Sequence, residues 1–112
     1  YALPALAYYC LKDYASATGN YTQAIALDPS FENAYNNRGL AYNGLIDYSS
    51  AIRDYTQAIA LNPNSAQAYN NRAVSLALSN DYRNATRDAR KACSLGACNA
   101  LEALGQNGWL RD

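Results

Sequence analysis

The stretch Tyr21-Thr-Gln-Ala-Ile-Ala-Leu27 recurs letter for letter as Tyr55 to Leu61, 34 residues further along the chain. A second stretch, Ala34-Tyr-Asn-Asn-Arg38, recurs at the same interval as Ala68 to Arg72. Self-similarity at one fixed period is the mark of a supersecondary unit that stacks on copies of itself. The sequence therefore predicts a repeat array and a binding surface, rather than a single closed core.

Aromatic and small residues keep the same register. All but one of the 11 tyrosines fall on four phases of this period, and Tyr14, Tyr48 and Tyr82 share one of them. Alanine or glycine holds other phases, as at Ala51 and Ala85. Where two helices cross closely, a small residue is needed at the crossing and a large ring fills the gap beside it. The pattern predicts one such contact of small with large in each repeat.

The spacing of apolar residues indicates helices. Within residues 48–61 they follow steps of three and four, the period of one helical face. Pro29 and Pro63 end such helices, because proline lacks an amide donor and disfavours helical geometry in the residue before it. We expect seven helices, at about residues 1–11, 14–27, 31–44, 48–61, 65–78, 82–95 and 98–109. Short turns with a helix-capping aspartate are expected at Lys12-Asp13, Ile46-Asp47 and Asn80-Asp81.

The repeat resembles the tetratricopeptide repeat over about residues 1–97. The matching residues are Tyr35, Gly39, Tyr42, Asp47, Tyr48, Ala51, Tyr55, Ala58 and Pro63. The resemblance implies an all-α fold, a right-handed α-solenoid of three helix-turn-helix units at residues 1–30, 31–64 and 65–97. Residues 98–112 are expected to form a capping helix. The alternative, that they begin another repeat, is disfavoured because Ala97 stands where Pro29 and Pro63 stood.

The resemblance also implies a protein–protein interaction scaffold that binds a peptide or partner segment in a concave groove. The first helix of each repeat would line it with Tyr9, Asn36, Asn37, Leu40, Asn43, Gln67, Asn70, Asn71 and Val74. Asn37 and Asn71 match the phase at which O-linked N-acetylglucosamine transferases hold peptide backbones with asparagines. An amide offers a donor and an acceptor to any peptide unit. Alternatively, these asparagines hydrogen-bond across neighbouring helices.

A chaperone-type carboxylate clamp, which grips an acidic C-terminal tail, is mostly missing. The matching phases hold Ala2, Leu6, Gln67 and Asn71 where that clamp needs basic side chains, and only Asn37 agrees with it. The expected groove is neutral, so a partner with an acidic chaperone-like tail is not expected.

Two arginines stand at a phase that is usually leucine in this family. Arg38 and Arg72 are each followed by an aspartate sixteen residues later, Asp54 and Asp88, on the second helix of the same pair. We expect two structural ion pairs, since a bidentate contact can satisfy a partly buried charge. The alternative is an arginine presented to an acidic ligand.

Cys93 and Cys98 flank the bend at Leu95-Gly96, and their separation permits either a disulfide or two free thiols that act as small apolar fillers. A disulfide would place the chain in a periplasmic or extracellular compartment, and reduced cysteines would place it in the cytoplasm. The sequence alone leaves the localisation unknown.

Composition disfavours several other functions. Nine basic and nine acidic residues give no net charge to attract nucleic acid, and no apolar run reaches the ~18 residues of a membrane span. The chain has no histidine and no phosphate-binding glycine loop. We therefore expect no enzymatic activity, cofactor or metal. The alternative function is a structural or self-assembly segment that stacks on further repeats, or on a second copy, through its N-terminal end.

Overall fold

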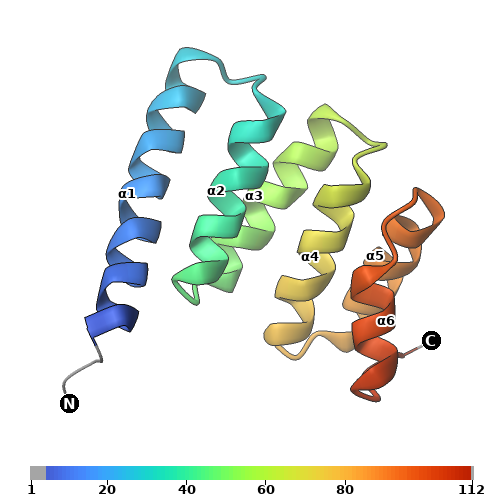
Figure 1. Ribbon diagram of the computed structural model, residues 1–112. Coiled ribbons are helices and arrows are strands. Elements are labelled where there is room, and N and C mark those ends of the chain that lie inside the picture. Colours follow the sequence, from blue (N-terminus) through green and yellow to red (C-terminus); the bar gives the residue numbers. More distant parts are fainter. Residues whose placement is uncertain (1–4, 112) are drawn as a thin grey trace.

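The structure is a computed structural model that describes residues 5–111, with side chains from Leu11 onward. Its described residues form six helices and no strand: α1 (Ala5–Leu27), α2 (Glu32–Gly44), α3 (Tyr48–Leu61), α4 (Ala66–Leu78), α5 (Tyr82–Ser94) and α6 (Asn99–Gln106). The helices stand side by side in chain order, and each contacts the next one (Figure 1). The predicted all-α helical-repeat fold is confirmed.

Every second helix belongs to one row. Helix α2 contacts α4 and α4 contacts α6, whereas no Cα atom of α3 comes within 8 Å of a Cα atom of α5. In a curved solenoid the elements on the concave side lie closer together than those on the convex side. The row of α2, α4 and α6, here called the inner row, is therefore the concave side of the array.

Aspartate caps begin the second helix of both hairpins, α2–α3 and α4–α5. The Asp47 carboxylate accepts a hydrogen bond from the Ser50 amide at 3.3 Å, and the Asp81 carboxylate accepts one from the Asn84 amide at 3.4 Å. A short acceptor at this position satisfies an amide that has no partner inside the helix. The turns and caps predicted at Asp47 and Asp81 are confirmed.

Replacing Ile46 with asparagine should raise the free energy of unfolding by about 1 kcal/mol. Ile46 has a φ of 62°, in the left-handed region where most side chains are strained by about 1–2 kcal/mol, and it is 69% exposed, so little burial is lost. Asn80 holds the same turn position in the other hairpin with a φ of 69°, which asparagine tolerates. Urea denaturation measures the gain, and the matched control Asn80→Ile should lose stability. An Ile46→Asn midpoint at or below that of the parent would contradict the expectation.

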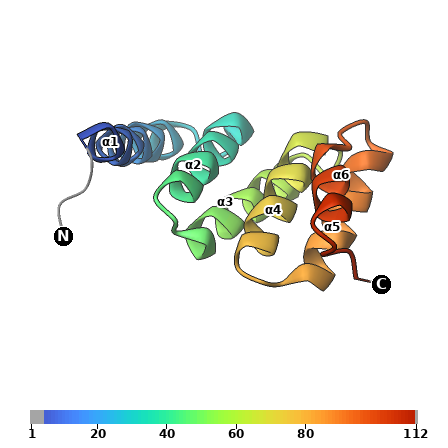
Figure 2. The same ribbon diagram turned by 60° about the horizontal axis from the view of Figure 1, so that its bottom comes forward.

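The predicted turn at Lys12-Asp13 is wrong. Helix α1 continues without a break from Ala5 to Leu27, so the two helices expected at residues 1–11 and 14–27 form one element over the described residues. Leu11 and Lys12 are good helix formers, whereas the last hairpin has Ser79 and Asn80 at the same phases. Among the described helices α1 contacts only α2, and it stands beside α2 at one end of the array (Figure 2).

Small residues allow the helices of each hairpin to approach closely. Ala51, Ala58, Ala85 and Ala92 are fully buried. Gly39 on α2 faces the ring of Tyr55 on α3 so closely that a Cβ at residue 39 would lie 2.5 Å from the ring. Gly44 faces the ring of Tyr14 on α1 in the same way. The predicted contact of small with large residues is confirmed where Gly39 meets Tyr55, whereas the contact of Gly44 with Tyr14 was not predicted.

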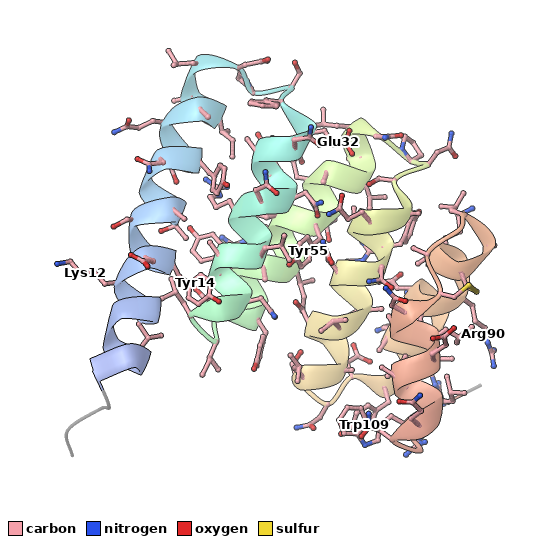
Figure 3. The ribbon with its side chains drawn as sticks, viewed as in Figure 1. Lys12, Tyr14, Glu32, Tyr55, Arg90 and Trp109 are labelled. Atoms are coloured by element: carbon pink, nitrogen blue, oxygen red, sulfur yellow. A yellow bond between two sulfur atoms is a disulfide. The ribbon has the colours of Figure 1, made fainter. Side chains whose placement is uncertain are left out.

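Helix α6 ends at Gln106, three residues before the predicted end, because Gly108 adopts a φ of 70° and reverses the chain. Trp109 then stacks on Tyr82 at the start of α5, with ring centroids 5.2 Å apart (Figure 3). Ala100 and Leu104 of α6 are buried against alanines of α4 and α5: Ala73, Ala77, Ala85 and Ala89. Helix α6 therefore covers the apolar end of the last hairpin.

Candidate functional site

The residues predicted to line the groove divide into an exposed set and a partly buried set. Leu40 on α2 and both Gln67 and Val74 on α4 are exposed. The five asparagines are buried or half-buried: Asn36, Asn37, Asn43, Asn70 and Asn71. Tyr9, predicted for the same groove, lies outside the residues whose side chains are described.

Three asparagines that were predicted to line the groove make hydrogen bonds between neighbouring helices of the inner row. The Asn71 Nδ2 on α4 donates to the Asn36 Oδ1 on α2 at 3.2 Å. The Ser75 hydroxyl on α4 donates to the Asn43 Oδ1 on α2 at 2.8 Å. An intramolecular hydrogen bond of this kind contributes about 1 kcal/mol to stability. These three asparagines therefore hold α2 and α4 together, which is the structural alternative considered for them.

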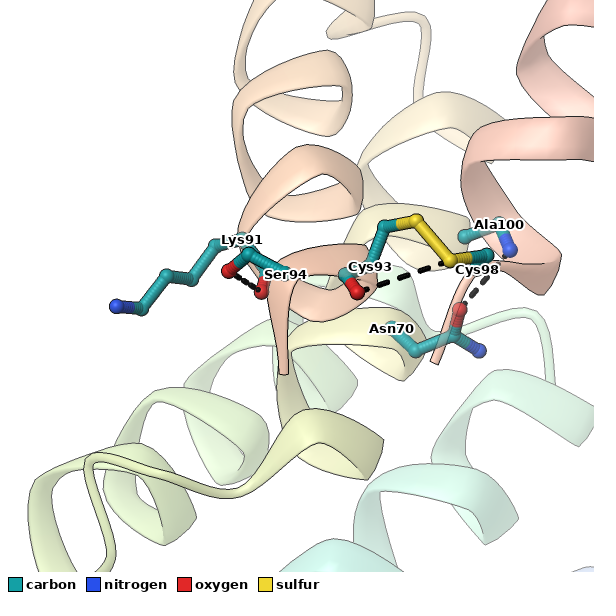
Figure 4. Close-up of a disulfide and its surroundings, with 6 residues drawn as sticks. All are labelled: Asn70, Lys91, Cys93, Ser94, Cys98 and Ala100. Carbon is teal, nitrogen blue, oxygen red and sulfur yellow. Dashed lines mark hydrogen bonds between the residues drawn. A yellow bond between two sulfur atoms is a disulfide. The ribbon is translucent and has the colours of Figure 1, made fainter. Parts of the chain in front are cut away.

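Asn70 serves the end of the array. Its Oδ1 accepts a hydrogen bond from the backbone amide of Ala100 at 2.9 Å (Figure 4). The N-cap residue of α6, Cys98, makes no side-chain capping hydrogen bond of its own. Asn70, an α4 residue predicted to line the groove, thus caps the start of α6 from a neighbouring helix.

Asn37 differs from the other four asparagines, because it makes no side-chain hydrogen bond with the described residues. It borders a hollow of about 420 Å³ between α1 and α2, here called the α1–α2 hollow. The described residues that line it carry no charge: Tyr14, Ala17, Tyr21, Asn37, Leu40, Ala41, Asn43 and Gly44. The hollow thus offers aromatic, amide and small apolar groups to a ligand.

A smaller hollow of about 70 Å³ lies between α4 and α6. Its lining is wholly apolar: Ala73, Val74, Ala77, Leu78, Ala100, Ala103, Leu104 and Trp109. Val74 and Leu78 are exposed at its edge. This hollow can accept a small apolar anchor of a bound segment.

The structure brings the predicted arginine and aspartate pairs together. Arg38 Nε and Nη2 each donate to one carboxylate oxygen of Asp54 at 2.7 Å, and Arg72 makes the same contacts to Asp88 at 2.6 and 2.9 Å. Both aspartates are buried. The hydrogen bonds to the carboxylates raise the pKa of Arg38 and of Arg72, although burial acts in the opposite direction.

A third partner of each arginine was not predicted. The Nη1 of Arg38 donates to the Thr22 hydroxyl on α1, and the Nη1 of Arg72 donates to the Thr56 hydroxyl on α3, both at 3.2 Å. The sequence contains an indication of this contact, because both threonines belong to the stretch that is repeated letter for letter. Each set of threonine, arginine and aspartate, here called a Thr–Arg–Asp clip, joins three consecutive helices. All three guanidinium nitrogens are engaged by the protein, which argues against an arginine presented to a ligand.

A disulfide joins Cys93 in the last turn of α5 to Cys98 at the start of α6 (Figure 4). The two Cα atoms lie 4.0 Å apart. Gly96, between them, has a φ of 107°, which only glycine adopts without strain, and this allows the tight turn. The disulfide and the cap from Asn70 together fix the start of α6.

A basic hollow on α5 was also not predicted. It measures about 330 Å³ and is lined by Arg83, Asn84, Thr86, Arg87, Arg90 and Arg111. The spacing of Arg83, Arg87 and Arg90 places them on one helical face, a signal that the zero net charge of the whole chain conceals. Among the side chains described, no group of histidine, cysteine or acidic residues could hold a metal ion, and no described helix could span a membrane.

Three sequence models of known repeats match the chain. Models described as a tetratricopeptide repeat match residues 32–65 and 54–87, and one described as a TPR repeat matches residues 5–45. The matches overlap and together extend from residue 5 to residue 87. The chain belongs to the tetratricopeptide repeat family. The match at residues 32–65 contains both helices of the hairpin α2–α3, so the family assignment agrees with the observed repeat.

Solved tetratricopeptide domains share the fold. The Arabidopsis OM64 TPR domain is 28% identical with a TM-score of 0.79, and the match covers 86% of this chain and 84% of that domain. The first TPR domain of Spaghetti (RPAP3), solved with the HSP90 peptide SRMEEVD, is 25% identical with a TM-score of 0.81, covering 90% and 82%. The second TPR domain of human RPAP3, solved with the HSP70 peptide SGPTIEEVD, is 26% identical with a TM-score of 0.78, covering 90% and 94%. No curated protein sequence matches the chain.

Proposed function

We propose that this tetratricopeptide chain binds a peptide or partner segment along the concave inner row of α2, α4 and α6. The observation that carries the proposal is a set of exposed, uncharged side chains on α2 and α4: Leu40, Gln67, Val74 and Leu78. They lie on the same row as Asn37, whose side chain bonds to none of the described residues. Apolar anchors and a few amides suit an extended or helical peptide. Two solved domains of the same fold carry peptides, which supports a binding role rather than a catalytic one.

The chemistry of the inner row favours a neutral partner. The peptides of both related domains end in the acidic sequence EEVD. In this chain Arg38 and Arg72 are the only basic residues of α2 and α4, and each is engaged with a buried aspartate. Helix α6 contains no basic residue. An acidic tail would therefore find no free cation on the inner row, and we propose a partner with apolar anchors and little charge.

Asn37→Ala and Asn71→Ala should have different effects, which separates binding from folding. Asn37→Ala should weaken peptide binding by about 1–3 kcal/mol and leave stability unchanged, because no described residue bonds to its side chain. Asn71→Ala should lower the free energy of unfolding by about 1 kcal/mol, because it removes the hydrogen bond to Asn36. Peptides selected from a random library on the immobilised chain provide the ligands, and calorimetry and thermal denaturation measure the two quantities.

Two charge insertions test where the selected peptides bind. Val74→Asp places a carboxylate on the inner row, and Gln57→Asp places one on the exposed face of α3 as the matched control. Val74→Asp should abolish binding while Gln57→Asp leaves it intact. Peptides that bind both variants equally would exclude the inner row, and tight binding of SRMEEVD would contradict a neutral partner.

We propose that α6 and the residues after it cap the array, and that α1 represents the first of three repeats. The buried Ala100 and Leu104 and the stacked Trp109 support the capping role, because a terminal repeat otherwise leaves an apolar face open to water. The alternative function, self-assembly through the N-terminal end, is favoured by one observation, the open α1–α2 hollow.

A further inference from the structure

The basic hollow on α5 lies apart from the inner row. Its lining comes from α5 and from the chain that follows α6, at the opposite end of the array from α1 (Figure 2). The described residues that line it include four arginines and no acidic residue, and its volume of about 330 Å³ lies within the range of ligand-binding clefts. Asp81, just before α5, is occupied by the backbone and side-chain amides of Asn84. The hollow is therefore positively charged, and a concave site of one charge attracts the opposite charge.

Two arginines of the hollow have no partner within the described part of the chain. Arg83 and Arg87 are exposed on one face of α5, about 6 Å apart along its axis, and neither makes a hydrogen bond or ion pair with a described residue. The one acidic residue of α5, Asp88, is buried and bound to Arg72. Arg90 lines the same hollow but is already engaged in a contact. Arg83 and Arg87 are therefore the two cations of α5 that a ligand in the hollow can use.

Arg111 brings a third cation to the hollow from outside α5. Its backbone amide donates to the Thr86 hydroxyl at 2.9 Å, which holds this part of the chain against α5. Its Nη1 donates to the carbonyl oxygens of Gly108 and Leu110 at 3.0 and 2.8 Å, and its guanidinium carbon lies 5.5 Å from the centre of the Tyr82 ring. No described residue accepts a hydrogen bond from its Nε or Nη2. A donor that is fixed before the ligand arrives loses little freedom on binding.

The cluster is specific to the last repeat. One repeat earlier only Arg53, the counterpart of Arg87, is basic, and two repeats earlier none of the counterparts is. The other counterparts of Arg83, Arg87 and Arg90 are neutral: Ala15, Gly19, Thr22, Ser49 and Thr56. The basic surface therefore does not continue along α1 and α3. Nucleic acid is bound through many phosphate contacts along an extended surface, whereas one isolated hollow suits a single compact anion.

We propose that the basic hollow binds a phosphorylated side chain of a partner protein, at a site independent of the inner row. A phosphorylated serine carries about −1.5 to −2 charges at neutral pH and three acceptor oxygens, whereas a carboxylate carries one charge and two oxygens. Three guanidinium groups around one hollow match the larger charge and the larger number of oxygens. Guanidinium groups donate to such oxygens in pairs, and clusters of arginine recognise phosphorylated segments in other folds. Arg83, Arg87 and Arg111 share the phosphate in this arrangement.

Phosphorylated peptides test the proposal on the whole chain. Short peptides with a central phosphoserine are selected from a random library on the immobilised chain, in the presence of an excess of the unphosphorylated library. The selected sequence is then made with phosphoserine, serine or glutamate at that position. Calorimetry should show that the phosphoserine form binds at least about 10-fold more tightly than either of the others. A library that yields no phosphorylated peptide, or a peptide that binds equally well with serine or glutamate, would overturn the proposal.

Arginine variants locate the site. Arg83→Gln and Arg87→Gln should each raise the dissociation constant of the phosphoserine peptide at least about 10-fold, whereas the matched control Arg53→Gln should leave it unchanged. All three side chains are exposed, so each variant should melt as the parent does. Asp112 follows Arg111 and lies outside the described residues. Asp112→Asn should not weaken binding, because it removes a negative charge and no donor. Equal binding by the parent and both α5 variants would exclude the hollow.

Other anions show whether the ligand is a protein segment. Vesicles of equal parts phosphatidylserine and phosphatidylcholine should not retain the chain. Retention that disappears in Arg83→Gln and Arg87→Gln would assign the hollow to a membrane surface and contradict the proposal. Inorganic phosphate that binds as tightly as the phosphoserine peptide would assign it to a free anion instead. Val74→Asp should leave phosphopeptide binding intact, so failure here is distinct from failure of the peptide site on the inner row.

Discussion

Gly39→Ala should lower the free energy of unfolding by about 2–3 kcal/mol, although alanine favours a helix over glycine by about 1 kcal/mol. A Cβ at residue 39 would lie 2.5 Å from Cε1 and 2.8 Å from Cδ1 of Tyr55. Because Tyr55 is 0% exposed, its ring cannot retreat into solvent. Either α2 and α3 must separate or the ring must leave its rotamer, and both changes lose packing. Urea denaturation measures the loss.

Two further glycines make the matched series. An added Cβ at Gly19 on α1 would have no neighbour within 4 Å, so Gly19→Ala should raise stability by about 0.5–1 kcal/mol. An added Cβ at Gly44 would lie 2.5 Å from the ring of Tyr14, but Tyr14 is 40% exposed and can turn aside, so the loss should be small. The expected order of stability is therefore Gly19→Ala, Gly44→Ala, Gly39→Ala. A Gly39→Ala variant as stable as the parent would show that the ring of Tyr55 is not fixed.

Arg38→Leu should have the larger effect, a loss of about 3–5 kcal/mol in the free energy of unfolding. Asp54 is 3% exposed, and both of its oxygens accept hydrogen bonds from Arg38. Leucine at residue 38 leaves that carboxylate buried without a partner, which costs far more than the loss of an exposed ion pair. Denaturation at neutral pH measures the change, and Arg72→Leu should behave alike because Asp88 has the same surroundings.

The double-mutant cycle decides whether the effect belongs to the pair. Arg38→Leu combined with Asp54→Asn should recover much of the loss, because no unpaired charge remains. Arg53→Leu on the exposed face of α3 is the control for removing an arginine as such, and it should change stability by less than about 0.5 kcal/mol. Losses that simply add in the double variant would exclude the pairing.

The hairpins could be predicted because several pairs of residues require the same alignment of the two helices. Gly39 against Tyr55 and Arg38 against Asp54 each require α3 to fold back along α2, so the fold is specified by several contacts at once. The turn at Lys12-Asp13 has no such support among the described contacts. There the local preference of Leu11 and Lys12 for helix decides, and an aspartate alone does not stop a helix.

The roles of the asparagines could not be read from their phase. Asn37 and Asn71 share one phase, yet the structure separates them, because the partner of Asn71 is Asn36, 35 residues earlier. The residue 35 positions before Asn37 is Ala2, which has no amide to offer. Whether a polar side chain faces a neighbouring helix or a ligand depends on which helix lies beside it, and a single repeat does not contain that information.

The Thr–Arg–Asp clips bear on how cooperatively the array unfolds. In a linear stack, stability is divided between the repeats themselves and the interfaces between neighbours. Here one guanidinium contributes both to the stability of its own hairpin and to the interface with the preceding helix, since Arg38 binds Asp54 within its hairpin and Thr22 on α1. When a terminal helix detaches, the hydrogen-bond network inside the neighbouring hairpin is therefore weakened. That hairpin is joined to the next clip, so the next clip is weakened as well. At the corresponding position one repeat after Arg72 the chain has Gln106 instead of an arginine, so the series of clips ends at α6, the helix that covers the last hairpin.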